Sequence, residues 1–180
     1  MTAGIPLLVI IGAPGAGKSR IGKRVAQLLR CDFVDTDRRI VAKHGPIPAL
    51  FTEFGEEHFR SLERAEVAKA LRERAVVALG GGAIVNADTR SDLAELPVAL
   101  VTVSADAVKS RISGSNRPLL TDGLKSWQRL VDSRREIYES LASRTWDTSA
   151  RAAEDVAADI AAWIRSDSSH THEETRRTPQ

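Results

Sequence analysis

Eight residues near the N-terminus, Gly-Ala-Pro-Gly-Ala-Gly-Lys-Ser at positions 12–19, restrict what this chain can fold into. They match the pattern G-x-x-x-x-G-K-[ST] between an apolar run at 7–11 and a segment with helical spacing. Glycines let backbone N–H groups turn toward phosphate oxygens, and the positive end of the following helix adds to the attraction. The stretch therefore predicts a nucleotide-phosphate loop between a strand and a helix, although a chance glycine-rich turn is the alternative.

In such a loop Lys18 neutralises the β- and γ-phosphates of ATP, and Ser19 ligates Mg²⁺. The nucleotide-binding residues that the loop predicts are Gly12, Ala13, Pro14, Gly15, Ala16, Gly17, Lys18 and Ser19.

Short runs rich in β-branched residues alternate along the chain with longer segments of helical spacing. The expected strands are 7–11, 33–35, 75–79, 98–103 and 145–148. This alternation predicts βαβ units, and so an α/β protein with a central parallel sheet. Because the unusual residues stand immediately after strands, and the carboxyl ends of parallel strands form the ligand crevice, we expect them to share one site.

Composition narrows the functional classes. The 180 residues include 26 Lys and Arg against 24 Asp and Glu, and no long basic run precedes the tail, so a nucleic-acid-binding surface is not indicated. The single cysteine, Cys31, cannot form an internal disulfide and favours a reducing compartment. The apolar run at 7–11 is too short to cross a membrane. We expect a cytoplasmic protein that binds no membrane and, with no evident oligomerisation helix, a monomer.

Two carboxylates, Asp35 and Asp37, stand where the second strand ends. On a strand they would point to the same face, where like charges need a cation or ligand donors between them. We expect Asp35 to support Mg²⁺, through water, and Asp37 to face an acceptor hydroxyl. Alternatively, or in addition, Asp37 caps a helix that starts near Arg38.

Two arginines fall inside apolar helix faces. Arg134 lies near the centre of the arc that begins at Trp127, and Arg60 lies in the arc that begins at Phe59, three residues before Glu63. Such arginines need a carboxylate or phosphate partner, and Glu63 is spaced to hold Arg60. Two such arginines in one cleft indicate an anionic substrate. The alternative for each arginine is an internal salt bridge or a snorkelling side chain.

Two further loops carry candidates. Gly80, Gly81 and Gly82 directly follow a strand, and they predict either close approach of the backbone to a ligand or a plain tight turn. The loop at 112–123 has glycines at both ends and contains Arg117, which would add positive charge if the loop closed over the site. The alternative for Arg117 is a solvated loop arginine.

Taken in order, these segments resemble the shikimate kinase family over about residues 7–163. The resemblance rests on GAPGAGKS, DTD at 35–37, FRSLE at 59–63, GGG at 80–82, RPLL at 117–120 and the R-x-x-x-Y of Arg134 to Tyr138. It implies a three-layer α/β/α P-loop kinase with a five-stranded parallel sheet. It also implies transfer of the γ-phosphoryl of ATP, with Mg²⁺, to the 3-hydroxyl of shikimate on the route to chorismate and the aromatic amino acids.

The resemblance also divides the chain. It implies a single kinase domain over residues 1–165, with a small helical substrate-binding region at about 36–62 and a lid at about 112–124. The polar remainder, 166–180, has no apolar periodicity and is predicted to be a disordered tail.

Individual roles follow from the resemblance in the same way. The catalytic residues would be Asp37, as the candidate base and a ligand of the substrate hydroxyls, with Lys18 and Arg117 on the phosphates. The substrate-binding residues would be Asp37, Arg60, Gly80, Gly81, Gly82 and Arg134, with Arg60 and Arg134 on the shikimate carboxylate. Arg111 and Arg151 would flank the adenine, while Ser19 and Asp35 would serve the metal.

The chain departs from the family pattern at two places. Pro46 and Pro48 stand where the family has a serine-containing stretch, and they are compatible with a helix only within its first turn. Ser149 replaces an asparagine near the expected adenine site. The alternatives are a gluconate kinase-like or nucleoside monophosphate kinase, and a nucleotide-binding paralogue that does not catalyse.

Overall fold

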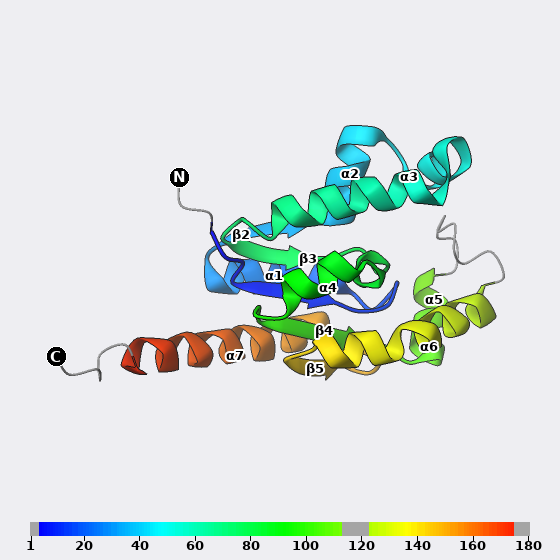
Figure 1. The fold of residues 1–180 in the computed structure, drawn as a ribbon. Helices are drawn as coiled ribbons and strands as arrows, with labels where there is room; N and C mark the ends of the chain where they lie inside the picture. Colours follow the sequence, from blue (N-terminus) through cyan, green and yellow to red (C-terminus); the bar gives the residue numbers. More distant parts are fainter. Residues whose placement is uncertain (1–3, 113–122, 175–180) are drawn as a thin grey trace.

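A computed structural model describes residues 4–112 and 123–174, and at its centre lies a five-stranded sheet whose neighbouring strands are all parallel (Figure 1). The strand order is β2-β3-β1-β4-β5. The prediction of a parallel α/β fold is confirmed, and each strand lies within one residue of its predicted ends. The strands are β1 (Leu8–Ile11), β2 (Asp32–Asp35), β3 (Ala75–Ala78), β4 (Val98–Thr102) and β5 (Arg144–Asp147).

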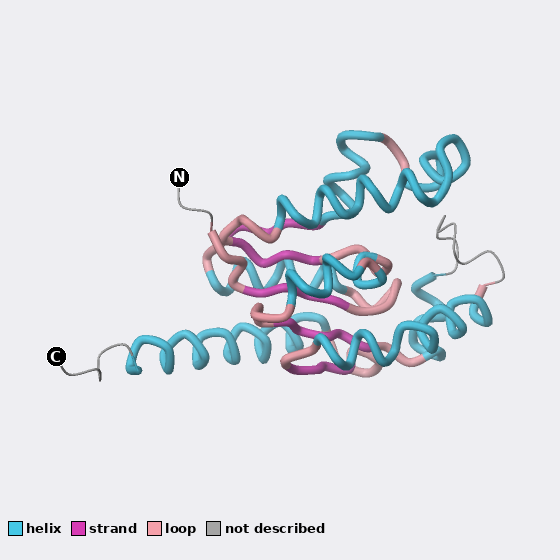
Figure 2. The backbone as a smooth tube through the Cα atoms, in the orientation of Figure 1, coloured by secondary structure: helices cyan, strands magenta, loops and turns pink. Residues whose placement is uncertain are grey.

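Helices cover both faces of the sheet (Figure 2). They are α1 (Lys18–Leu29), α2 (Thr36–His44), α3 (Ile47–Ala70), α4 (Ala87–Leu93), α5 (Ala105–Ile112), α6 (Leu124–Leu141) and α7 (Ala153–Glu174), with the 3-10 turn η1 (Ala83–Val85). None of these helices is both long enough and apolar enough to cross a membrane.

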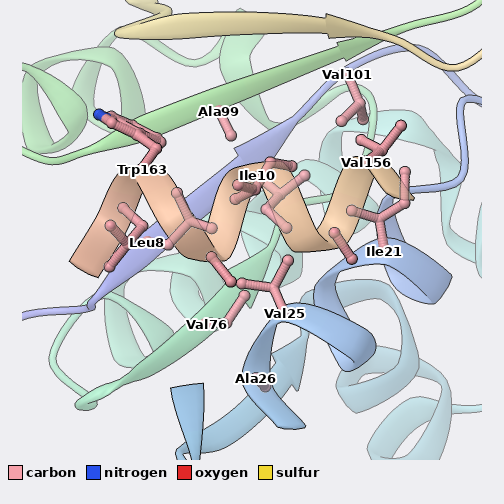
Figure 3. Packing of buried hydrophobic residues seen from close by; sticks show 14 of the residues in the cluster. Leu8, Ile10, Ile21, Val25, Ala26, Val76, Ala99, Val101, Val156 and Trp163 are labelled. Atoms are coloured by element: carbon pink, nitrogen blue, oxygen red, sulfur yellow. The ribbon is translucent and has the colours of Figure 1, made fainter. Parts of the chain in front are cut away.

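Successive strand residues point to opposite faces, so each face has its own core. On one face α1 and α7 pack against side chains that include Leu8, Ile10 and Val101 (Figure 3). On the other face α3, α4 and α6 pack against side chains that include Val9 and Leu100. Burial on both faces explains why the strands are almost continuously hydrophobic.

The helix α7 is longer than the sequence suggested. A disordered tail was expected from residue 166, whereas the helix continues to Glu174. Its packed part ends near Ile164, the last α7 residue in the core. No glycine or proline stands between Ile164 and Glu174, so no strong helix breaker ends the helix where its packing ends.

The pair α2 and α3 lies beside β2 at one edge of the sheet (Figure 1). The cap of α3 is Pro46, and Pro48 lies in its first turn, so both prolines are compatible with the helix. Gly55, at φ 83°, interrupts α3, and its left-handed conformation is one that glycine adopts without strain.

Ion pairs and a small apolar cluster fix α2 against α3. Arg39 donates to both carboxylate oxygens of Glu73, at 2.5 and 2.8 Å. The buried Glu66 pairs with Lys43 and lies 3.6 Å from Arg39. Ile40 of α2 packs against residues of α3 in the same region. These contacts hold α2, from Arg39 to Lys43, against α3 and the turn that follows α3.

The packing of α7 can be tested at Ile160, whose side chain is fully buried between α1 and the sheet. We expect Ile160→Ala to lower the free energy of unfolding by about 2–5 kcal/mol, through lost burial and a residual cavity. The smaller change Ile160→Val should cost about 0.5–1.5 kcal/mol. Urea unfolding measures both values, and a loss for the alanine variant no larger than for the valine variant would contradict this packing.

Candidate active site

The loop between β1 and α1 is shaped by glycine. At Gly12, with φ 147°, an added Cβ would overlap with the carbonyl oxygen of Val101, so no other residue fits there. Gly17 precedes α1 in a left-handed conformation and provides no side-chain cap. The first turn of α1 contains no acidic residue. Its N–H groups and the helix dipole therefore favour an anion at this end.

Contacts from distant elements hold this loop in place. Lys18 Nζ donates to the carbonyl oxygens of Gly12 and Ala13, at 2.8 and 3.1 Å. Trp127 Nε1, on α6, donates to the carbonyl oxygen of Pro14 at 2.8 Å. Thr148 Oγ1, which follows β5, lies 3.0 Å from the carbonyl oxygen of Ala16. The loop is thus preorganised by segments more than 100 residues away.

Asp35 connects the loop to α2. Ser19 Oγ donates to Asp35 Oδ2 at 2.5 Å, while Asp35 Oδ1 accepts from the backbone N–H of Arg38 at 3.0 Å. The cap of α2 is therefore Asp35, and the alternative that Asp37 caps this helix is wrong, because the helix already begins at Thr36. The two carboxylates do not lie on one strand face: Asp35 ends β2 and Asp37 lies in the first turn of α2.

The adjacent oxygens of Ser19 and Asp35 suit a hard cation such as Mg²⁺. Among residues 4–112 and 123–174, no group of three or more His, Cys, Asp or Glu side chains could hold a metal alone. Two protein oxygens beside a phosphate loop fit an ion that arrives with the nucleotide and keeps water and phosphate ligands.

Asp37 faces the turn after β3. A Cβ added to Gly80 would overlap with Asp37 Oδ1 and would lie 3.0 Å from Glu63 Oε1, so a side chain there would displace the Asp37 carboxylate. The backbone N–H of Gly80 donates to Thr36 Oγ1 at 3.1 Å. In this structure the Gly80 N–H thus has a neighbouring hydroxyl as its acceptor, and the substrate-binding role expected for Gly80 stays a prediction.

Asp37 shares a pocket of about 460 Å³ with the phosphate loop. Lys18, Ser19 and Asp35 also line it, together with Gly15, Gly17, Arg20, Lys23, Arg38 and Leu79. The expected metal, phosphate and acceptor groups are thus brought to one cavity.

Arg60 extends from α3 over the same turn. A Cβ at Gly82 would overlap with Arg60 Nη1, which shows how closely the guanidinium approaches this backbone. Nη1 donates to Glu63 Oε2 at 2.7 Å, so the predicted i,i+3 pair is confirmed. Nε and Nη2 donate to Glu56 Oε1 at 3.3 and 3.1 Å. Burial lowers the pKa of Arg60, but the two glutamates outweigh it and leave this pKa above its usual value.

Arg134 reaches the turn from α6, on the other side. Its Nη1 donates to the carbonyl oxygen of Gly81 at 3.0 Å, and Tyr138 Oη donates to the same oxygen at 2.6 Å. Arg134 is only 8% exposed. Burial raises the pKa of Tyr138, and the Arg134 guanidinium opposes that change. The arginine predicted inside an apolar face is therefore buried at the candidate site.

Glu63 is the buried carboxylate between these groups. Burial raises its pKa above the usual range, Arg60 and Arg134 oppose the rise, and the negative charge of Asp37 adds to it. Two arginines and two carboxylates therefore interact around the three glycines.

A second pocket, of about 360 Å³, lies where the adenine of ATP is expected to bind. Arg151 lines it, with Arg20, Thr148 and the loop residues Gly15 to Gly17, and Arg151 Nη2 pairs with Asp159 at 2.7 Å. Ser149 makes a local contact, since its hydroxyl donates to Asp147 Oδ1 at 2.5 Å.

Most of the expected lid at 112–124 lies outside the described residues, and so does Arg117. Only the end of α5 and the start of α6 are described within this range. The side chain of Arg111 also lies outside the described part of the structure.

Sequence reasoning missed several residues of the site. The sequence indicates Trp127 only as the start of an apolar helix face. It does not distinguish Thr36 from the two aspartates beside it. A buried tryptophan normally finds a partner for its N–H, which is the one signal that could have indicated the contact with Pro14. Nothing local in the sequence marked Thr148 or Glu56.

A phosphate loop between a strand and a helix of a parallel sheet, sharing one pocket with Asp37, is the arrangement of a P-loop kinase. A family model described as shikimate kinase matches residues 14–165. The shikimate kinase of Thermobifida fusca is 45% identical over 160 residues, which cover 87% of this chain and 93% of that protein. The shikimate kinase of Salinispora tropica is 42% identical over 165 residues, covering 89% and 99%.

The structural comparison agrees with these relatives. The shikimate kinase from Acinetobacter baumannii, solved in complex with shikimate, superimposes with a TM-score of 0.85 at 31% identity and covers 92% of this chain and 96% of its own. The chain belongs to the shikimate kinase family.

The contact between α6 and the phosphate loop can be tested with Trp127→Phe. This change leaves the Pro14 carbonyl without its donor in a buried position, so we expect a loss of about 1–3 kcal/mol in unfolding free energy. The KM for ATP should rise several-fold more than the KM for the acceptor. The control is Trp146→Phe, at a ring that packs against Trp163. An unchanged ATP KM in Trp127→Phe would show that the contact does not shape the loop.

Proposed function

We propose that this protein transfers the γ-phosphoryl group of ATP to the 3-hydroxyl of shikimate, giving shikimate 3-phosphate and ADP. Family membership supports this proposal, as does the structural similarity to a shikimate kinase solved with shikimate. We also propose that the protein is cytoplasmic and monomeric, as predicted from the sequence.

One observation carries the proposal at the level of the site. Arg60 and Arg134 approach the turn at 80–82 from different helices, and Asp37 lies against the same turn. Two guanidinium groups at one point suit a single planar carboxylate, since each can donate two parallel hydrogen bonds. An acceptor held there by its carboxylate would place its ring hydroxyls between Asp37 and the phosphate loop.

The residue roles follow from this placement. Asp37 orients the acceptor hydroxyl and takes its proton, while Lys18 leaves the loop carbonyls to neutralise the β- and γ-phosphates. Ser19 and Asp35 hold Mg²⁺, directly or through water, and that ion would neutralise charge on the phosphates. We also propose that Gly80, Gly81 and Gly82 line the substrate and that Arg111, Arg117 and Arg151 contact the nucleotide, as the family resemblance implies.

Catalysis in this scheme consists mainly of positioning and charge neutralisation, because phosphoryl transfer needs little covalent help from the protein. A gluconate kinase-like activity and a non-catalytic role are not favoured, because the family match covers residues 14–165 and all the named charged groups are present.

The proposal is tested by measuring ADP release from purified protein with Mg²⁺ and ATP, in the presence of shikimate, gluconate, AMP or no acceptor. We expect release that depends on shikimate. Release with another acceptor would overturn the assignment of the substrate, and ATP binding without release above background would overturn the assignment of an enzyme.

Asp37→Asn should lower kcat at least about 100-fold, because the amide cannot take the proton of the acceptor hydroxyl. The KM for ATP should change little. Asp88→Asn, at an exposed position in the first turn of α4, is the control for loss of one negative charge. Near-normal turnover of the Asp37 variant would remove this residue from the mechanism.

Arg134→Lys should raise the KM for shikimate by about 10- to 100-fold, because lysine cannot make the bidentate contact. Arg135→Lys is the matched control, since the neighbouring Arg135 is exposed and pairs with Asp132. Thermal melting of both variants separates a binding defect from unfolding. An unchanged shikimate KM in a folded Arg134 variant would assign Arg134 a purely structural role.

A further inference from the structure

The guanidinium group of Arg60 has two carboxylate partners on its own helix. Glu63 accepts from Nη1, while a single oxygen of Glu56 accepts from both Nε and Nη2. The edge formed by Nε and Nη2 is one of the sides on which a guanidinium binds a carboxylate through two parallel hydrogen bonds. Glu56 therefore covers a position that a substrate carboxylate could use.

The two glutamates differ in how firmly they are held. The Glu63 side chain is 4% exposed and lies among Arg60, Asp37 and Arg134, so removing it would leave buried charge uncompensated. The Glu56 side chain is 58% exposed, and its contact with Arg60 spans one turn of α3. The Arg60 side chain is 24% exposed, so Glu56 is the partner that water solvates when the pair separates, and helix pairs with this spacing are weak.

We propose that Glu56 is a built-in competitor for the substrate carboxylate. In the free protein it occupies the Nε and Nη2 edge of Arg60, and the acceptor displaces it on binding, while Glu63 stays in place. The inference rests on the proposed function, because it assumes that Arg60 receives the carboxylate of the acceptor.

This exchange makes Glu56 a specificity-determining residue. Displacing Glu56 costs an ion pair, and only an acceptor that brings its own carboxylate replaces that pair. A neutral polyol would leave Arg60 with an unfilled edge, or would have to bind beside Glu56. The arginine keeps a negative partner in both states, so its charge is compensated in both.

An opposite role for Glu56 makes the opposite prediction. If Glu56 only oriented the Arg60 guanidinium, its removal would weaken substrate binding. If Glu56 competes, its removal strengthens binding. The sign of the change in the shikimate KM and Kd therefore separates the two roles.

The test compares Glu56→Gln and Glu56→Ala with the wild-type protein. We expect both to lower the KM and the Kd for shikimate, by about two- to five-fold, which is the range for an exposed ion pair. The alanine variant should show at least the effect of the glutamine variant, since glutamine can still accept a hydrogen bond. The changes in kcat and in the ATP KM should be smaller than the change in the shikimate KM.

Glu57→Gln is the control, because Glu57 is exposed and lies one residue along the same helix. It removes the same charge from the same stretch of α3, without removing the hydrogen bonds between Glu56 and Arg60. An equal effect in the Glu57 variant would overturn the proposal in favour of a general charge effect. An unchanged or raised shikimate KM in Glu56→Ala would also overturn it. A wild-type protein that neither binds nor phosphorylates shikimate would instead refute the proposed function.

Discussion

Hydrogen bonds from one face of α6 set the spacing of the whole site. Trp127, Arg134 and Tyr138 are separated by seven and four residues, so they lie on the same side of the helix. Trp127 donates to the carbonyl oxygen of Pro14, and the other two donate to that of Gly81. The same rigid helix thus holds the loop after β1 and the turn after β3.

The two loops also touch each other directly. A Cβ added to Gly81 would lie 3.2 Å from Cδ of Pro14, so the turn and the phosphate loop are tightly packed at this point. The contact lies just beyond the carboxyl ends of β1 and β3, which are paired in the sheet. A shift of α6 would therefore move the phosphate site and the acceptor site together.

The site concentrates buried charge that the fold alone does not need. Asp35, Glu63 and Arg134 are all less than one-tenth exposed, and each makes a hydrogen bond to another group of the site. Buried charges of this kind contribute little net stability compared with apolar residues. Their grouping around the candidate site is better explained by the binding of charged ligands.

The sequence predicted the parts of the structure that depend on local pattern. Strand positions followed from apolar runs, the phosphate loop from its glycines, and the Arg60–Glu63 pair from helical spacing. The alternative that Asp37 caps α2 is wrong, and the sequence could not exclude it, because Asp35 and Asp37 are equally good capping residues and only the point where β2 ends decides between them. The contacts of Trp127 and Thr148 could not be predicted, since each joins segments more than 100 residues apart. The length of α7 was underestimated, because apolar periodicity reports packing rather than helical conformation.

The central claim is that Arg60 and Arg134 hold one carboxylate while Asp37 and the phosphate loop meet the hydroxyl to be phosphorylated. A crystal structure of the protein with shikimate and ADP would test it most directly. Our account predicts that the shikimate carboxylate lies within hydrogen-bonding distance of both guanidinium groups and that the 3-hydroxyl lies beside Asp37, facing the loop. A carboxylate bound away from either arginine, or a 3-hydroxyl pointing away from Asp37, would contradict it.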